Sequence, residues 1–94
     1  MRSPFYRFII HGSSMLPFLK EGQEVLVWCW FYKPKVGDIV VIGKNGKDMV
    51  KRIQKIHDRK YFVGGDNKRE STDSRSFGPI DKSEIIGKVV FVVR

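Results

Sequence analysis

Three clusters of polar residues interrupt an otherwise apolar and β-branched sequence, and each could carry chemistry. The first is Gly12-Ser13-Ser14-Met15-Leu16-Pro17, the second is Val50-Lys51-Arg52-Ile53, and the third comprises residues 65–67 and 71–75. Together they offer the side chains of a nucleophile, a base and an orienting hydroxyl. Each cluster also has an ordinary structural interpretation as a turn, a strand edge or a solvated loop.

Lys51 lies in a short apolar run, where a β-strand would place it on one face with Met49 and Ile53. A lysine packed among apolar side chains loses hydration, and its pKa falls. A neutral amine near pH 7 requires a fall of roughly 3 to 4 pH units from the usual value. The sequence therefore offers Lys51 either as a general base or as a surface lysine whose head group reaches solvent.

Ser14 lies at the end of an expected strand, three residues before Pro17. It is either a turn residue or a nucleophile whose own backbone N–H helps to stabilise an oxyanion. Gly12 would let the backbone of a substrate approach closely, because glycine has no side chain.

The third cluster has the pattern of a pinned loop. In an extended segment Ser71, Asp73 and Arg75 share one face. Asp73 and Arg75 could then form an ion pair, which leaves the Ser71 hydroxyl to hydrogen-bond the Lys51 nitrogen. The alternative is a solvated loop with an incidental ion pair worth at most ~1 kcal/mol.

The elements that must position these residues are mainly β-strands. Runs of β-branched and aromatic residues predict strands over 5–10, 23–32, 38–42, 49–56, 60–63 and 85–93. Turn residues separate these runs, and the longest stretch without a regular pattern is 64–78. No window predicts a long amphipathic helix. The sequence therefore indicates a single all-β domain over residues 1–94, a barrel or a sandwich.

Composition limits the class of protein. The 94 residues include 18 Lys and Arg against 10 Asp and Glu, a net charge of +8, and 41% of them are hydrophobic. A chain of this length forms one small domain, and its apolar fraction is too high for a disordered basic tail. Cys29 is the only cysteine, which excludes an intramolecular disulfide. One cysteine and two histidines cannot supply the ligands of a usual structural zinc site.

The sequence predicts a cytoplasmic protein. No apolar run approaches the ~20 residues that a membrane-spanning helix needs. The N-terminal segment MRSPFYRFII is interrupted by Arg7 and is not followed by the small-residue cleavage site of a signal peptide. A free cysteine also fits a reducing compartment.

In their order along the chain, the polar clusters resemble the type I signal peptidase family of serine endopeptidases. The resemblance rests on five motifs: Ser14-Met15-Leu16-Pro17, Gly37-Asp38-Ile39-Val40-Val41, Val50-Lys51-Arg52-Ile53, Gly65-Asp66-Asn67 and Ser71-Thr72-Asp73-Ser74-Arg75-Ser76-Phe77-Gly78. A further segment, Ile86-Gly87-Lys88-Val89, looks like the closing strand of the family. The resemblance implies a catalytic core of coiled antiparallel sheets that form a small, partly open barrel.

The resemblance also implies a Ser/Lys dyad, with Ser14 as nucleophile, Lys51 as general base and Ser71 orienting the lysine. The Ser14 backbone N–H would form part of the oxyanion hole beside Gly12, where many relatives have a serine. The other matched residues are expected to be structural near the site: Met15, Pro17, Arg52, Asp66, Asn67, Asp73, Ser74 and Arg75. Neither a metal nor a cofactor is implied, and the expected partner is a precursor protein or its leader peptide.

The sequence departs from the family pattern in three ways. We expect no membrane anchor before the serine motif. Gln54-Lys55-Ile56-His57 replaces a Gly-x-Pro-Gly turn, and only residues 57–60 join two strands where some members carry a large β insertion. Short relatives without an anchor include proteases that resemble the maturation proteases of nickel-type superoxide dismutase. Removal of a leader from such a precursor is therefore one expected function.

Three alternatives to a Ser/Lys protease stay open. A Ser/His/Asp triad could combine Ser14 with His11 or His57 and with Asp73. A basic β-barrel with 2 Trp, 3 Tyr and 7 Phe could bind single-stranded nucleic acid. That function would not explain the order of the clusters, so we expect no nucleic-acid partner. A catalytically silent relative would keep the motifs without a desolvated lysine.

The run Trp28-Cys29-Trp30-Phe31-Tyr32 has two interpretations. It is either core and protected strand edge, or a patch that contacts the membrane interface, where Trp and Tyr are favoured. With a net charge of +8, the second interpretation predicts peripheral attachment to anionic lipid through Trp28, Trp30, Phe31 and Tyr32.

Overall fold

The computed structural model describes residues 3–93. Its six strands are β1 (Phe5–Ile9), β2 (Glu24–Trp28), β3 (Ile39–Lys44), β4 (Lys47–His57), β5 (Lys60–Gly64) and β6 (Ile85–Val93). The helical elements are short: the 3-10 helices η1 (Lys68–Glu70) and η2 (Lys82–Glu84), and the helical turn α1 (Ser74–Phe77). The prediction of an all-β protein is confirmed. Among residues 3–93, no helix has the length and apolar character needed to cross a membrane.

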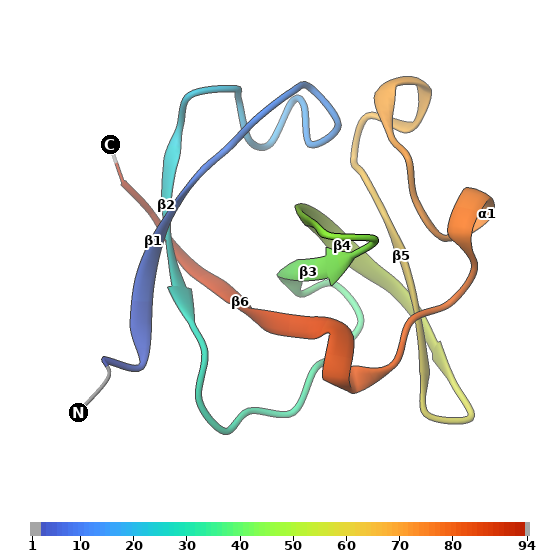
Figure 1. Cartoon of the computed structure of the whole chain (residues 1–94). Helices are drawn as coiled ribbons and strands as arrows, with labels where there is room; N and C mark the ends of the chain where they lie inside the picture. Colours follow the sequence, from blue (N-terminus) through green and yellow to red (C-terminus); the bar gives the residue numbers. More distant parts are fainter. Residues whose placement is uncertain (1–2, 94) are drawn as a thin grey trace.

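All six strands belong to one sheet with the order β1-β2-β6-β3-β4-β5, and every pairing is antiparallel. The sheet is strongly coiled, with β1 and β2 on one side, β4 and β5 on the other, and β6 running between them (Figure 1). No pairing among the described residues joins the edge strands β1 and β5, so the coiled sheet does not close into a barrel.

The coiled sheet encloses two clusters of buried side chains. The first cluster lies between the β1–β2 half and the centre of the sheet: Ile10, Met15, Leu19, Val25, Val27, Ile39, Val41 and Val50. The second cluster consists of Val40, Ile42, Ile53, Val63 and Ile80. β3 contributes to both clusters because alternate residues of a strand point to opposite faces. This arrangement explains why all four residues from Ile39 to Ile42 are buried.

The strand predicted over 23–32 is wrong beyond residue 28, where β2 ends. Trp28 pairs with Phe5, the first residue of β1, so β2 has no further residue of β1 to pair with beyond Trp28. The Cys29 N–H still donates to the carbonyl of Pro4 at 2.7 Å, and the chain then leaves the sheet. Phe31 is consequently 99% exposed and Trp30 is 40% exposed. The other predicted strands agree with the structure within a few residues.

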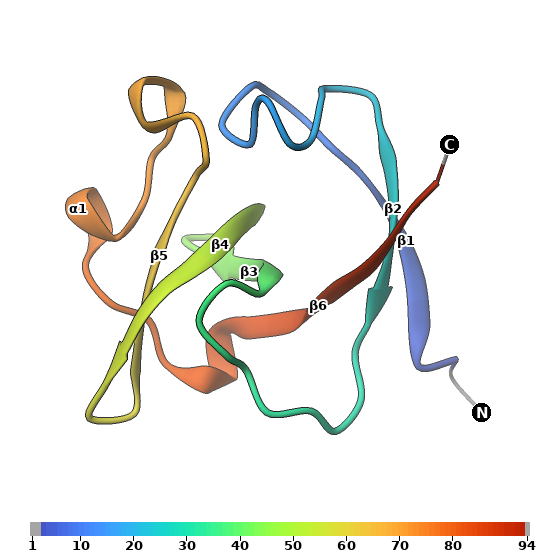
Figure 2. The ribbon, with the colours of Figure 1, turned by 180° about the vertical axis from the view of Figure 1, so that it is seen from behind.

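Two loops lie side by side at one end of the molecule. The loop that joins β1 to β2 and the loop that follows β5 are adjacent in the view of Figure 1 and in the view from behind (Figure 2). The Asn67 N–H donates to the Ser14 carbonyl at 2.7 Å, which confirms the contact. The turn between β4 and β5 lies at the opposite end in both views. The fold therefore brings the first and third polar clusters of the sequence together.

Candidate active site

A tight hairpin fixes the position of Lys51 on β4. Asn45 and Gly46 have φ angles of 52° and 77°, as the two-residue Asn-Gly turn requires. The resulting register sets Lys51 opposite Val40, at the buried centre of the sheet. Lys51 is only 3% exposed, and this burial lowers its pKa from the usual value. The negative charge of Asp73 acts in the other direction but does not cancel the effect of burial.

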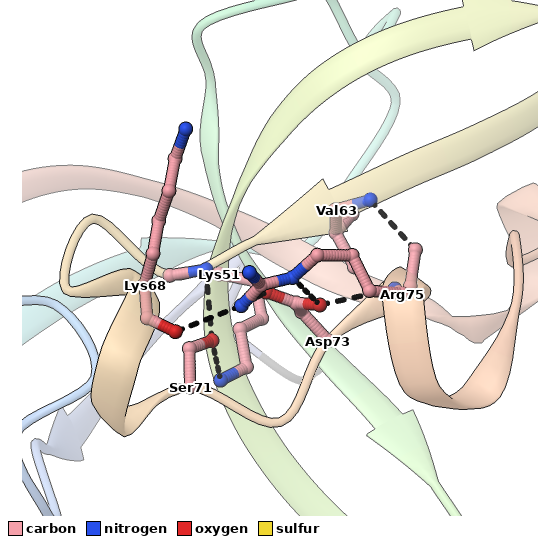
Figure 3. Close-up of polar contacts among 8 residues, drawn as sticks. Lys51, Val63, Lys68, Ser71, Asp73 and Arg75 are labelled. Atoms are coloured by element: carbon pink, nitrogen blue, oxygen red, sulfur yellow. Dashed lines mark hydrogen bonds and ion pairs between the residues drawn. The ribbon is translucent and has the colours of Figure 1, made fainter.

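The Lys51 amine donates a hydrogen bond to the Ser71 hydroxyl. The distance between Lys51 Nζ and Ser71 Oγ is 3.0 Å (Figure 3). The same oxygen accepts a hydrogen bond from the Gly65 N–H, also at 3.0 Å. Ser71 is thus held by the residue that follows β5, and its hydroxyl contacts the Lys51 amine. The structure brings together the predicted base and the hydroxyl that is predicted to orient it.

Asp73 and Arg75 form the predicted ion pair, in the same loop as Ser71. Arg75 donates from Nε and Nη2 to the two carboxylate oxygens of Asp73, each at 2.9 Å (Figure 3). Burial raises the pKa of Asp73, but hydrogen bonds from Arg75 and Ser71 outweigh it and leave the pKa below its usual range. The expectation of one extended segment is wrong from residue 74, where α1 begins. Asp73 caps this turn by accepting from the Arg75 N–H at 3.0 Å, so one carboxylate serves both contacts.

Two further contacts tie the loop to the sheet. The Ser74 hydroxyl accepts a hydrogen bond from the Val63 N–H on β5 at 2.8 Å (Figure 3). Arg52 donates from Nε and Nη2 to the two oxygens of the Asp66 carboxylate, each at 2.8 Å. Arg52 points away from Lys51 because neighbouring residues of a strand face opposite sides. Arg52, Asp66 and Ser74 therefore hold the loop in place without contacting the Lys51 amine.

Ser14 lies in the loop between β1 and β2, in the wall of a cleft of about 230 Å³. Lys51, Gly12 and Thr72 line the same cleft. Met15 is 1% exposed and packs in the first buried cluster, so the residue after Ser14 anchors the loop to the core. The structure thus places the predicted nucleophile and the predicted base in the walls of one cleft. Pro17 lies nearby but is not among the residues that line this cleft.

Gly65 has a role that only the structure reveals. A Cβ atom on Gly65 would lie 2.4 Å from the Ser14 carbonyl oxygen and 2.5 Å from Ser71 Oγ. Only a residue without a side chain lets the loop that carries Ser14 approach Ser71 this closely. The glycine pair at the end of the strand pattern is the sequence signal for such an approach.

His11 lines the cleft together with Ser14, but within residues 3–93 no hydrogen bond or ion pair joins Asp73 to either histidine, as a Ser/His/Asp triad requires. His57 lies at the end of β4 and contacts Asp58 at 3.2 Å. The Asp73 carboxylate is bound by Arg75, and no ion pair within residues 3–93 joins it to His11. The described part of the chain also holds no group of three or more His, Cys, Asp or Glu side chains placed to bind a metal ion.

Comparisons with known proteins agree with the motifs. A family model described as signal peptidase, peptidase S26, matches residues 53–94. Signal peptidase IB of Staphylococcus aureus strain Mu50 is 44% identical over 62 residues, which cover 63% of this chain and 32% of that protein. Signal peptidase I of Buchnera aphidicola subsp. Baizongia pistaciae is 54% identical over 77 residues, which cover 82% of this chain and 25% of that protein. In its motifs and over most of its length, the chain is similar to type I signal peptidases.

The match covers only part of the signal peptidases compared. This chain spans 32% of the length of the Staphylococcus aureus protein and 25% of the Buchnera aphidicola protein. The family model of the signal peptidases begins after Lys51, so it includes Ser71 but neither Ser14 nor Lys51. The chemistry of this signal peptidase relative therefore depends on the geometry of the cleft that Ser14 and Lys51 line.

Proposed function

We propose that this chain is a serine endopeptidase that uses Ser14 and Lys51 to remove an N-terminal leader or signal segment from a precursor protein. One observation carries the proposal. The buried Lys51 amine donates to Ser71 Oγ at 3.0 Å and lines the cleft that Ser14 also lines. A lysine with a purely structural role normally keeps its amine in water. A desolvated amine held by a neutral hydroxyl is suited to accept a proton.

In the proposed reaction, neutral Lys51 accepts the proton of the Ser14 hydroxyl while Ser14 Oγ attacks the carbonyl carbon of the scissile peptide bond. The Ser14 backbone N–H donates to the oxyanion that forms. The C–N bond then breaks as the Lys51 ammonium returns the proton to the leaving amine. The leader remains bound to Ser14 as an ester.

The second half of the reaction releases the leader. Water attacks the ester carbonyl and gives a proton to Lys51, and the tetrahedral intermediate collapses with departure of Ser14 Oγ. Ser14 recovers its proton from Lys51, and the leader leaves with a free carboxyl group. The Ser71 hydroxyl accepts one N–H of Lys51 throughout, which directs the lone pair of the neutral amine away from Ser71 and towards the cleft.

Gly12 distinguishes this cleft from those of relatives with a serine at that position. Its φ of 81° and the open space around it allow close passage of a substrate backbone. It cannot supply a side-chain donor to the oxyanion. Loss of one such donor lowers kcat by roughly 10²–10³ where it was in use. We therefore expect modest turnover from the chain.

The proposal is tested by cleavage of leader peptides with the full chain. The panel contains peptides with small residues at the first and third positions before the cut, and the N-terminal segment of a nickel-type superoxide dismutase precursor. Mass spectrometry identifies the bond that is cut. Wild type should cleave one bond, whereas Ser14→Ala and Lys51→Ala should be slower by a factor of about 10³ or more.

Ser83→Ala and Lys35→Ala are the matched controls, since both side chains are exposed and lie outside the cleft. They should cleave at the wild-type rate. Equal cleavage by all five proteins, or none by folded wild type, would contradict the proposal. If folded wild type is inactive but binds single-stranded DNA with a steep salt dependence, the nucleic-acid alternative is supported.

We also propose that the aromatic run after β2 contacts a membrane surface. Phe31 is 99% exposed and Trp30 is 40% exposed. Trp28, at the end of β2, packs edge-to-face against both Trp30 and Phe5. Its ring centroid lies 6.4 Å from that of Trp30 and 5.0 Å from that of Phe5. Tyr32 packs against the second buried cluster, so the exposed part of the patch is Trp30 and Phe31.

Flotation with vesicles tests this contact. Wild type should float with vesicles that contain phosphatidylglycerol and less with phosphatidylcholine alone, because the net charge of +8 attracts anionic lipid. The double variant Trp30→Ser/Phe31→Ser should float less. Ile56→Ser, at an exposed apolar position on β4, is the control and should behave as wild type. Absence of flotation, or flotation that the double variant does not reduce, would contradict the contact.

A further inference from the structure

We infer that Asn67 is a positioning residue that holds the Ser14 nucleophile in place relative to the Lys51 base. The inference rests on the proposed function, because it assigns a role within that reaction. It is drawn from residues 65–67, Gly65-Asp66-Asn67, which we call the bridge segment. Each residue of the bridge segment contacts a different part of the candidate site.

Asn67 binds the two peptide groups that flank the Ser14 Cα atom. Its backbone N–H donates to the Ser14 carbonyl at 2.7 Å. Its side-chain Nδ2 donates to the Ser13 carbonyl at 3.1 Å. The Ser13 carbonyl belongs to the peptide group before the Ser14 Cα, and the Ser14 carbonyl belongs to the one after it. When both peptide planes are held, the direction of the Cα–Cβ bond of Ser14 is held as well.

The other two residues of the bridge segment bind the side of the site that carries the base. The Gly65 N–H donates to Ser71 Oγ, which accepts from the Lys51 amine. The Asp66 carboxylate binds Arg52, the residue after Lys51 on β4. Ser14 and Lys51 come from separate elements of the fold, yet both are attached to the same three consecutive residues. The bridge segment therefore sets their relative placement.

The side chain of Asn67 is not used for an ordinary structural purpose. Asn67 occupies the N-cap position of η1, where an asparagine usually accepts a hydrogen bond from the helix. Here it makes no capping hydrogen bond, and its amide instead donates to the Ser13 carbonyl. Loss of this donor should leave η1 unaffected and should release the peptide group before Ser14.

Isosteric variants isolate this hydrogen bond. Asn67→Leu has a similar shape without a donor, and Asn67→Asp replaces the donor by an acceptor that repels the Ser13 carbonyl. Both should lower kcat about 10- to 100-fold with KM within about threefold, because misplacement of a nucleophile by 1 Å costs about 10² in rate. The pH at which activity rises should be unchanged in Asn67→Leu, since the contacts of Lys51 do not involve this side chain. Asn45→Asp, the same substitution in the β3–β4 turn, is the control and should keep the wild-type kcat.

Hydrogen exchange gives a readout that does not need activity. Amides of residues 13–16 should exchange faster in Asn67→Leu than in wild type, with no change around α1. Wild-type kcat and wild-type exchange in Asn67→Leu would overturn the inference. An equal loss of protection throughout the chain would also overturn it, because it would indicate a general structural role. If wild type itself cleaves nothing, the proposed function fails, and exchange at residues 13–16 still decides whether Asn67 holds Ser14.

Discussion

Lys51 Nζ lies 3.0 Å from Ser71 Oγ, and the lysine that makes this contact is 3% exposed. The hydrogen-bond partner is neutral, so the amine has lost its hydration without gaining a direct ion pair in exchange. Both activity and stability then depend on the protonation of Lys51, because the buried site disfavours the charged form. The pH dependence of cleavage and the stability of a Lys51 variant therefore report the protonation of this amine.

Peptide cleavage should rise with pH through the lowered pKa of Lys51. Burial lowers this pKa, and only the neutral amine accepts the Ser14 proton, so activity is low below the pKa and reaches a plateau above it. The dependence of kcat/KM on pH between about pH 5 and about pH 10 measures it. Ser71→Ala should lower the plateau about 10- to 100-fold, because the amine loses its orienting partner. A flat profile would exclude a lysine base.

Lys51→Met should abolish cleavage and stabilise the fold. The substitution removes a buried amine whose protonated form prefers water, and we expect a gain of about 1–2 kcal/mol near neutral pH. The lowered pKa means that the unfolded chain binds more protons than the folded chain between that pKa and ~10.4. The gain in the free energy of unfolding from Lys51→Met should therefore become smaller as the pH rises towards ~10.4. Urea unfolding at two pH values measures this change, and Lys55→Met on the exposed part of β4 is the control. If Lys51→Met were less stable than wild type, burial of the Lys51 amine would not destabilise the folded chain.

Gly65→Ala should impair both cleavage and stability. The new methyl group would meet the Ser14 carbonyl oxygen at 2.4 Å and Ser71 Oγ at 2.5 Å, so the two loops must separate. We expect a fall in kcat of about 10² and a loss of about 1–3 kcal/mol in the free energy of unfolding. In the control Gly43→Ala, the nearest atom is the flexible Ile86 Cδ1 at 3.4 Å. Wild-type kcat in Gly65→Ala would show that the close approach is dispensable.

Asp73→Asn should destabilise the fold in a pH-dependent way. Although burial raises the pKa of Asp73, the hydrogen bonds from Arg75 and Ser71 hold it below the unfolded value of ~3.9. The ionised carboxylate therefore adds stability above about pH 4 that is lost as the pH falls through the lowered pKa. We expect a loss of about 1–3 kcal/mol at neutral pH and a smaller difference near pH 3. Urea unfolding checks this, and the exposed Asp58→Asn should change little. An equal loss at both pH values would show that the ionised form is not favoured in the folded chain.

The sequence by itself determined the strands and the residue types of the site. Short alternating runs bounded by turn residues identify strands because the signal is local, and an Asn-Gly pair specifies a hairpin on its own. The ion pair between Asp73 and Arg75 could also be predicted from the sequence, because the two residues are close in the chain and opposite in charge. The end of β2 at Trp28 could not be predicted, because it depends on where β1 begins.

Only the tertiary structure decided the burial of Lys51, the approach of Ser14 to Gly65 and the attachment of both to one segment. These features depend on distant parts of the chain. Val40 lies opposite Lys51 on the neighbouring strand β3, and the Asn67 side chain in one loop donates to the Ser13 carbonyl in another. A lysine in an apolar strand is compatible with solvent or with a core until its neighbours are placed. The chemistry assigned to Lys51 follows from its desolvation, and desolvation is a property of the packed fold.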